Sequence, residues 1–195
     1  MLVGRGLGIF QTRGAKLTNN YIEGTGASQP GLVYIQKASE LVLISGNTIK
    51  RIGTAAGPAL KAIMHNSGMP GRLIIESNHI ESATDGNLID LESVQDVTVA
   101  SNELVFMGPT PGVFAGVKAR ATERDLEGLL VTGNRALGPL KSLVDLSATP
   151  FKIGSVSVIG NLSRGVGKGM TCATTGGALK PIVFASLERD PGHKS

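Results

Sequence analysis

The chain has 195 residues, of which 41% are hydrophobic, 17% charged and 4% aromatic, a composition that fits one domain with a sizeable core. The net charge is +4, but the basic residues are scattered and aromatic residues for base stacking are few, which argues against a nucleic-acid partner. No apolar run approaches the roughly 18 residues that cross a membrane, and the first residues lack the apolar stretch of a secretory signal, so the sequence predicts no membrane contact.

The predicted elements begin with a strand over residues 7–13, which enters the first of six similar segments. In each segment the residues five and three positions before an asparagine are apolar, and the residue just before it is Gly, Ser or Asn. The segments cover residues 15–22, 42–49, 73–80, 97–104, 129–136 and 156–163, with the asparagines at Asn20, Asn47, Asn78, Asn102, Asn134 and Asn161.

A recurrence every 24–32 residues is typical of a solenoid. Apolar residues two positions apart indicate a strand with one buried face. A small residue followed by Asn favours a tight bend, because Gly and Asn adopt left-handed backbone conformations at low cost. Each segment therefore predicts a strand, a sharp corner and the start of another strand, with the asparagines stacked as a buried, hydrogen-bonded ladder.

This pattern resembles the right-handed parallel β-helix of the pectate-lyase-like superfamily, which includes phage tailspikes, over roughly Gly8 to Ser163. The resemblance implies an all-β, right-handed, single-stranded parallel β-helix of about six to seven coils, with the asparagines at the corner between the second and third strands of each coil. It implies little about activity, because this superfamily hosts lyases, hydrolases, epimerases, tailspikes and adhesins.

We expect the β-helix domain over residues 1–187, as a fragment without its N-terminal cap, and a polar tail over residues 188–195. A bare first coil exposes unpaired backbone groups. We therefore expect a preceding domain, or a partner chain in a homotrimer, to cover it.

One strand precedes each asparagine segment, and its residues alternate between the core and the outer face. The coil around Lys61 does not alternate clearly. The resemblance implies that this outer face carries polysaccharide. The predicted outward residues are Tyr34, Gln36, Asp90, Glu92, Lys118, Arg120, Asp145 and Ser147.

Asp90 and Glu92 are the candidate catalytic acids, because their spacing on one strand approaches the roughly 6.5–9.5 Å of inverting glycosidases. Tyr34, Gln36, Lys118, Arg120 and Asp145 are the candidate substrate-binding residues. Two alternatives stay open: acids that are merely solvated, and opposite charges that pair across neighbouring strands. Calcium prefers six to eight oxygen ligands. Since basic residues stand among the three acids, we expect no metal and no cofactor.

Three functions remain open. The chain is a polysaccharide-binding module of a tailspike, tail fibre or adhesin, a glycoside hydrolase or polysaccharide lyase, or an inert scaffold segment of a larger protein. The expected partner is an acidic or neutral polysaccharide and the expected location is extracellular or virion-associated. The absence of Trp and the presence of only two Tyr leave few platforms for sugar stacking.

Overall fold

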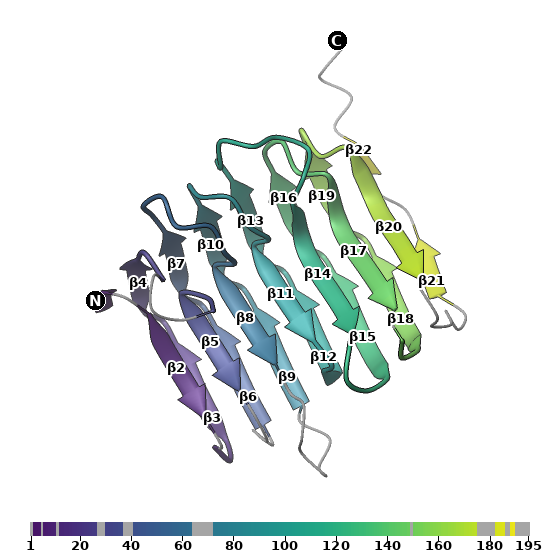
Figure 1. Cartoon of the computed structure of the whole chain (residues 1–195), viewed down its shortest axis with the longest axis horizontal. Helices are drawn as coiled ribbons and strands as arrows, with labels where there is room; N and C mark the ends of the chain where they lie inside the picture. Colours follow the sequence, from purple (N-terminus) through teal and green to yellow (C-terminus); the bar gives the residue numbers. More distant parts are fainter. Residues whose placement is uncertain are drawn as a thin grey trace.

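The computed structural model describes residues 2–4, 6–10, 12–26, 30–36, 41–63, 72–148, 150–174, 182–185 and 188–189. These residues wind into a parallel β-solenoid of about six turns, in which each turn contributes one strand to each of three sheets (Figure 1). All strand pairings among the described residues are parallel. The predicted all-β solenoid is therefore confirmed.

In the six coils that carry a ladder asparagine, sheet 1 contains the strand that precedes the asparagine segment, sheet 2 the strand that begins it, and sheet 3 the strand that follows the asparagine. Sheet 1 contains β2 (Leu7–Phe10), β5 (Val33–Gln36), β8 (Leu60–Ile63), β11 (Ile89–Glu92), β14 (Ala115–Ala121), β17 (Ser142–Ala148) and β20 (Lys168–Thr174). Sheet 2 contains β3 (Ala15–Thr18), β6 (Leu41–Ser45), β9 (Arg72–Glu76), β12 (Gln95–Ala100), β15 (Leu126–Thr132), β18 (Ile153–Ile159) and β21 (Ile182–Ala185). Sheet 3 contains β1 (Leu2–Gly4), β4 (Tyr21–Gly24), β7 (Thr48–Arg51), β10 (His79–Ser82), β13 (Glu103–Phe106), β16 (Arg135–Leu137), β19 (Leu162–Arg164) and β22 (Glu188–Arg189).

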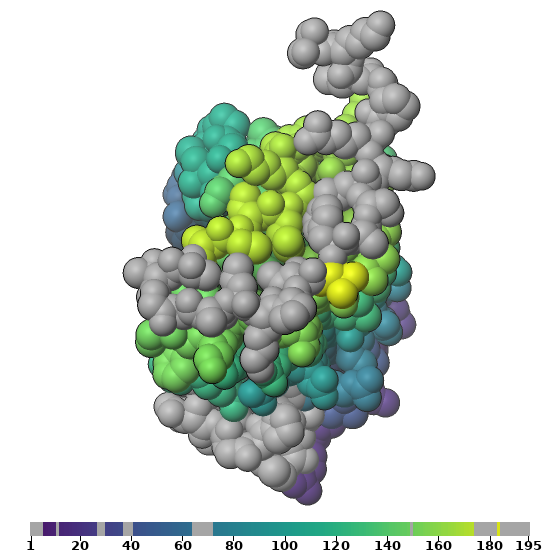
Figure 2. Space-filling view, turned by 90° about the vertical axis from the view of Figure 1, so that its right-hand side faces the viewer, coloured from purple at the N-terminus to yellow at the C-terminus, as the bar shows by residue number. Residues whose placement is uncertain are grey.

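The coils stack in sequence order, so the colours run from purple to yellow along the solenoid (Figure 1). Figure 2 views the stack from its C-terminal end, with the last described coils in yellow and green in front of the earlier ones. Residues 188–189, which lie in the expected tail, form β22 beside β19, and residues 190–195 lie outside the described part of the chain.

The core is a column of apolar side chains that repeats from coil to coil. In the second to sixth segments, the residues five and three positions before each asparagine are at most 1% exposed. They are Val42, Ile44, Leu73, Ile75, Val97, Val99, Leu129, Val131, Val156 and Val158. The first coil differs, since its inward side chains Leu7, Ile9, Ala15 and Leu17 are only partly buried against this core.

The asparagine ladder is confirmed. The side-chain nitrogen of each asparagine from Asn20 to Asn134 donates to the side-chain oxygen of the next one, at 2.9–3.2 Å. The backbone N–H of the same residue donates to the same oxygen, at 2.9–3.0 Å. Five of the six asparagines are only 1–2% exposed: Asn47, Asn78, Asn102, Asn134 and Asn161.

The predicted tight bend is also present at all six ladder asparagines. The residue just before each ladder asparagine has a positive φ of 54–67°, in the left-handed region. These residues are Asn19, Gly46, Ser77, Ser101, Gly133 and Gly160. The small residue before each asparagine is therefore required by the corner, because longer or branched side chains are strained in this conformation.

Candidate functional site

The outer face of sheet 1 carries two straight rows of side chains, one residue per coil. Strand register aligns the first row as Gly8, Tyr34, Lys61, Asp90, Lys118, Asp145 and Thr171. The second row is Phe10, Gln36, Ile63, Glu92, Arg120, Ser147 and Ala173. All seven residues predicted as catalytic or binding therefore belong to one surface, and neighbouring members of a row are about 4.8 Å apart.

The coil that the sequence left ambiguous is resolved by its burial. Leu60 and Ala62 are 0% exposed and point inward, so Lys61 and Ile63 lie on the outer face. The sequence pattern was unclear here because the flanking residues are also apolar, and register with β11 decides the matter. His65, two residues after this strand, lies outside the described residues.

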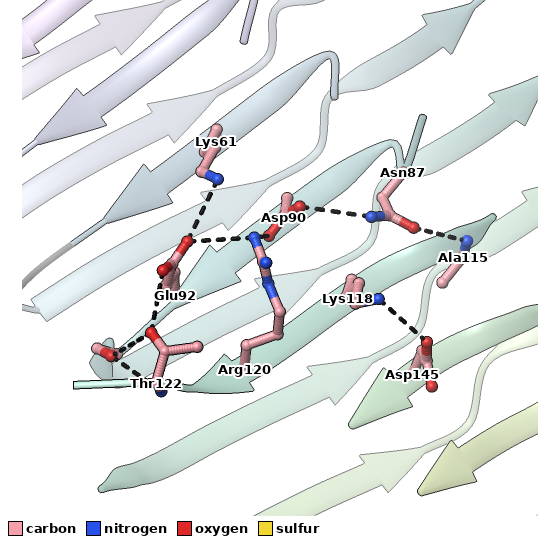
Figure 3. Close-up of polar contacts among 10 residues, drawn as sticks. Lys61, Asn87, Asp90, Glu92, Ala115, Lys118, Arg120, Thr122 and Asp145 are labelled. Carbon is pink, nitrogen blue, oxygen red and sulfur yellow. Dashed lines mark hydrogen bonds and ion pairs between the residues drawn. The ribbon is translucent and has the colours of Figure 1, made fainter. Parts of the chain in front are cut away.

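Arg120 joins the two candidate catalytic acids (Figure 3). Its Nη2 donates to Asp90 Oδ1 at 2.9 Å and to Glu92 Oε2 at 3.1 Å. Lys61 Nζ lies 3.2 Å from the same Glu92 oxygen, and Thr122 Oγ1 donates to Glu92 Oε1 at 3.0 Å. Glu92 is thus held by cations from the neighbouring coils on both sides, and Asp90 is held by the cation of Arg120 from one of them.

Glu92 is stabilised as an anion. Burial raises its pKa, but the charge of Arg120, the Thr122 hydrogen bond and Lys61 together outweigh that effect, so the pKa lies below its ordinary value. A general acid of a glycosidase needs the opposite shift, so that it holds a proton near neutral pH. The Arg120 guanidinium also bonds both acids at once. This geometry keeps both carboxylates ionised, and it is poorly suited to a carboxylic acid that donates a proton to a substrate.

A second ion cluster is centred on Asp145. Its Oδ2 lies 3.7 Å from Lys118 Nζ and 3.5 Å from Lys141 Nζ, and its Oδ1 accepts a hydrogen bond from Thr171 Oγ1 at 2.6 Å.

Asn87 holds Asp90 in place. The Asn87 Nδ2 atom donates to Asp90 Oδ2 at 3.4 Å, and the Asn87 Oδ1 atom accepts from the backbone N of Ala115 at 3.0 Å.

In most of these ion pairs the basic side chain is more exposed to solvent than the acidic one. The Arg120 side chain is 29% exposed, against 9% for Asp90 and 17% for Glu92. Lys118 and Lys141 are 30% and 44% exposed, against 12% for Asp145. Lys61, at 15%, is as deep as Glu92. Across most of this face the acids form a lower layer and the basic groups meet the solvent.

An exposed aromatic ring lies at the N-terminal end of the face. Phe10 is 46% exposed, and its ring packs edge-on against Tyr34 with centroids 5.8 Å apart. Tyr34 itself is only 5% exposed, and burial, with the charge of Glu92, raises its pKa. The ring lies over Gly8, where an added Cβ would clash with it. Phe10, not Tyr34, is therefore the accessible aromatic platform.

Sequence reasoning missed four contributors to this face: Phe10, Lys61, Asn87 and Thr122. For Phe10 a signal existed, because the alternation Leu7-Gly8-Ile9-Phe10 puts it in the row of Gln36. Asn87 and Thr122 lie just outside β11 and β14, so no strand periodicity could place them.

Within the described part of the chain, no group of three or more His, Cys, Asp or Glu side chains could hold a metal ion. The same residues contain no helix that is long and apolar enough to span a membrane. Comparison of the chain with protein-family models, with curated proteins and with solved structures finds no match. The outer face of sheet 1 must therefore be interpreted from its own geometry.

Proposed function

We propose that the chain is a polysaccharide-binding module of the tailspike, tail-fibre or adhesin type, acting outside the cell or on a virion. In this proposal an extended glycan lies along the outer face of sheet 1. The coil would be right-handed, as in the pectate-lyase-like superfamily, and the support for that resemblance is the asparagine corner repeated on six successive coils.

The proposal rests on the outer face of sheet 1, where polar side chains stand in rows along the solenoid and are held in place by ion pairs. Seven strands at intervals of about 4.8 Å give a face roughly 29 Å long, which suits a polymer better than a small ligand. Lys118 and Arg120 are held by acids beneath them, so little side-chain freedom remains to be lost on binding. Phe10 supplies an apolar surface for a sugar ring at one end.

Binding is preferred over cleavage on the chemistry of the two acids. Asp90 and Glu92 accept hydrogen bonds from the same Arg120 nitrogen, and the pKa of Glu92 is lowered rather than raised. Neither feature favours a proton-donating acid. The enzymatic alternative nevertheless makes a distinct prediction about these two residues, which the second experiment below uses.

The first experiment removes basic groups from two faces in matched numbers. The double variant Lys118→Ala, Lys141→Ala acts on sheet 1, and the double variant Lys50→Ala, Arg135→Ala acts on the outer face of sheet 3. Both lower the net charge by two. We expect retention of the chain by an acidic polysaccharide in affinity gels to fall about tenfold for the first variant, most clearly at low salt, and to change little for the second. Equal effects of the two variants would reject this face as the binding site.

The second experiment separates binding from cleavage. Asp90→Asn and Glu92→Gln keep the shape of each side chain and remove its charge. If the wild-type chain releases shorter glycans, each variant should slow that release by about 10²–10⁴-fold while binding persists. If the wild type releases none, the enzymatic alternative is rejected. If no substitution on the face changes glycan binding, the chain is a scaffold segment.

A further inference from the structure

A groove lies at the corner where the chain passes from sheet 3 to sheet 1. It is formed by the loops that follow β7, β10 and β13, which lie side by side in the stack (Figure 1). Its volume is about 390 Å³, near the lower end of the range of about 300–1,000 Å³ that is usual for small-molecule sites. None of its lining residues belongs to the two rows of sheet 1, so the groove is a separate surface.

The lining of the groove combines one charged group with apolar surface. Asp85 is its one ionisable side chain. Ala83 and Met107 are exposed, Met107 at 53%, and Ala56 and Pro109 add further apolar atoms. A ligand that fills the groove therefore meets alkyl groups along its sides and one carboxylate.

The Asp85 carboxylate has no basic partner in the described part of the chain. Its Oδ1 accepts from the backbone N of Thr110 at 3.0 Å, and its Oδ2 accepts from Thr110 Oγ1 at 2.6 Å. By contrast, Asp90, Glu92 and Asp145 each have a basic nitrogen at 2.9–3.7 Å. An ionised carboxylate accepts about four hydrogen bonds, so the two Asp85 oxygens retain capacity for a donor from the groove.

The three loops are already tied together without a ligand. Arg51, which is 2% exposed, donates to Ala56 O at 3.3 Å and to Thr84 Oγ1 at 3.1 Å, and so joins the first two loops. The backbone N of Gly57 donates to Asp85 O at 2.6 Å, and the bonds from Asp85 to Thr110 join the third loop. A preformed groove lowers the ordering cost of binding. Because Arg51 is buried among oxygen acceptors, the charge that a ligand reaches is that of Asp85.

We propose that this groove binds a primary alkylammonium group, with the nitrogen at Asp85 and the alkyl chain along Met107 and Ala83. An ammonium has three N–H donors and no acceptor, so it matches the unused acceptor capacity of the carboxylate. The resulting hydrogen bond is charge-assisted and therefore stronger than a neutral one. The apolar side chains suit the methylene groups, which gain free energy on leaving water. The ammonium comes either from a lysine side chain of another protein or from a free aliphatic amine.

Other ligand classes fit this lining less well. The lining residues include no aromatic ring on which a sugar could stack. An anion would meet the Asp85 carboxylate with no accessible cation to offset the repulsion.

The test uses protein labelled at the methionine methyl groups and follows the Met107 signal by NMR as pentylammonium is added. We expect a saturable shift with a dissociation constant in the millimolar range. Pentanol has the same alkyl chain without the charge and should bind at least about tenfold more weakly, as should pentylammonium to Asp85→Asn, because a hydrogen bond to a charged group is lost. The amide keeps the shape of Asp85 and can still bond Thr110. The matched control is Asp125→Asn, since Asp125 also accepts from a backbone N, that of Lys152 at 2.8 Å, and it should leave the dissociation constant unchanged.

A second variant tests the position of the ligand without changing any charge. Ala83→Leu fills the groove from an exposed position and should abolish the shift, and it replaces Asp85→Asn should that variant fail to fold. Circular dichroism and the thermal transition check that each variant keeps the solenoid.

The source of the ammonium is separated by a second probe, Nα-acetyl-lysine methylamide. Binding as tight as that of pentylammonium indicates a lysine side chain of a partner protein, and weaker binding indicates a free amine. The proposal is overturned by a wild-type chain that gives no saturable shift, by pentanol that binds as well as pentylammonium, or by equal effects of Asp85→Asn and Asp125→Asn. A neutral monosaccharide that binds the groove more tightly than pentylammonium overturns it as well. No residue of the sheet 1 rows enters this measurement, so its outcome is independent of the proposed function.

Discussion

Replacing Asn102 by Leu tests how much the asparagine ladder stabilises the solenoid. The Asn102 oxygen accepts from the backbone N of Asn78 at 3.0 Å and from its side-chain nitrogen at 2.9 Å. The Asn102 side-chain nitrogen donates to Ile75 O and to Asn134 Oδ1, both at 2.9 Å. Leucine has a similar volume and can replace none of these bonds.

The consequences differ among the four partners. Asn134 Oδ1 still accepts from the backbone N of Asn102, and the side-chain nitrogen of Asn78 still donates to Ile44 O and Glu76 O. The backbone N–H of Asn78 loses the Asn102 oxygen as its acceptor, and Ile75 O loses its asparagine donor. An unsatisfied buried polar group costs about 1–3 kcal/mol, so two such groups should lower the free energy of unfolding by roughly 2–6 kcal/mol.

Asn20→Leu is the control, because Asn20 is the first member of the ladder and is only half-buried. Its side-chain nitrogen donates to Thr18 O, in an exposed bond, and to Asn47 Oδ1, which keeps the backbone N of Asn20 as a donor. We expect a loss below about 1 kcal/mol, since water can replace the exposed bond.

Urea denaturation followed by circular dichroism measures both variants, and thermal melting should separate them by several degrees, at roughly 2–4 °C per kcal/mol for a chain of this size. Equal losses for Asn102→Leu and Asn20→Leu would contradict the argument, because they would mean that burial within the ladder adds nothing.

Two further predictions concern the left-handed bend at Gly160 and the loss of folding stability at acidic pH. Gly160→Ala should lower the free energy of unfolding by about 1–2 kcal/mol in urea denaturation, because Gly160 has φ +61° and no atom within 4 Å of an added Cβ, which leaves backbone strain as the cause. A neutral result would show that this corner tolerates a different conformation. The second prediction follows from the lowered pKa of Glu92 in the folded state. Its ionised form stabilises the fold above the unfolded pKa of about 4.3, and this contribution is lost as pH falls through the lower folded pKa. Glu92→Gln should therefore flatten the fall of stability with decreasing pH, as measured by urea denaturation from neutral to acidic pH, whereas an unchanged slope would place the acid sensitivity elsewhere.

The ladder could be predicted from sequence because its determinants are local. Apolar residues two apart, then a small residue, then Asn are enough to specify a strand and a left-handed corner, as at Gly133-Asn134. Repetition then converts the local pattern into a global one, since each coil must stack on the last with the same register. The outward residues of β5, β11, β14 and β17 followed from the same alternation.

Other features depend on contacts between coils that no single coil encodes. Arg51 is 2% exposed, and its guanidinium donates to Pro58 O, Ala55 O and Thr84 Oγ1. Its charge is buried among neutral partners, and that burial lowers its pKa. From sequence, an arginine at the end of a strand predicts a solvated side chain. Only the structure of the loop after β7 shows that the Arg51 guanidinium is enclosed by its backbone carbonyls.

A backbone irregularity in sheet 2 could not be predicted from the sequence either, because it also depends on how the coils stack. Asp96, Gly128 and Ser155 have positive φ on three successive coils, and the strand pairing skips each of them. Three different residue types share this position, so composition gives no common signal. The bulge is a property of the stack, since one skipped residue must be matched on the next coil to keep the register.

The charge pattern of sheet 1 also follows from stacking. Side chains of one row lie about 4.8 Å apart, and like charges directly opposite each other destabilise neighbouring strands. A solenoid therefore cannot place cations at the same position of every coil without a penalty. The row Lys61, Asp90, Lys118, Asp145 avoids it by alternating sign. Because Asp90 and Asp145 lie deeper than the basic groups that pair with them, the alternation still leaves mainly cationic groups at the surface. An acidic polymer would then meet the basic groups of Lys118, Arg120 and Lys141, while the acids remain beneath them to keep the stack stable.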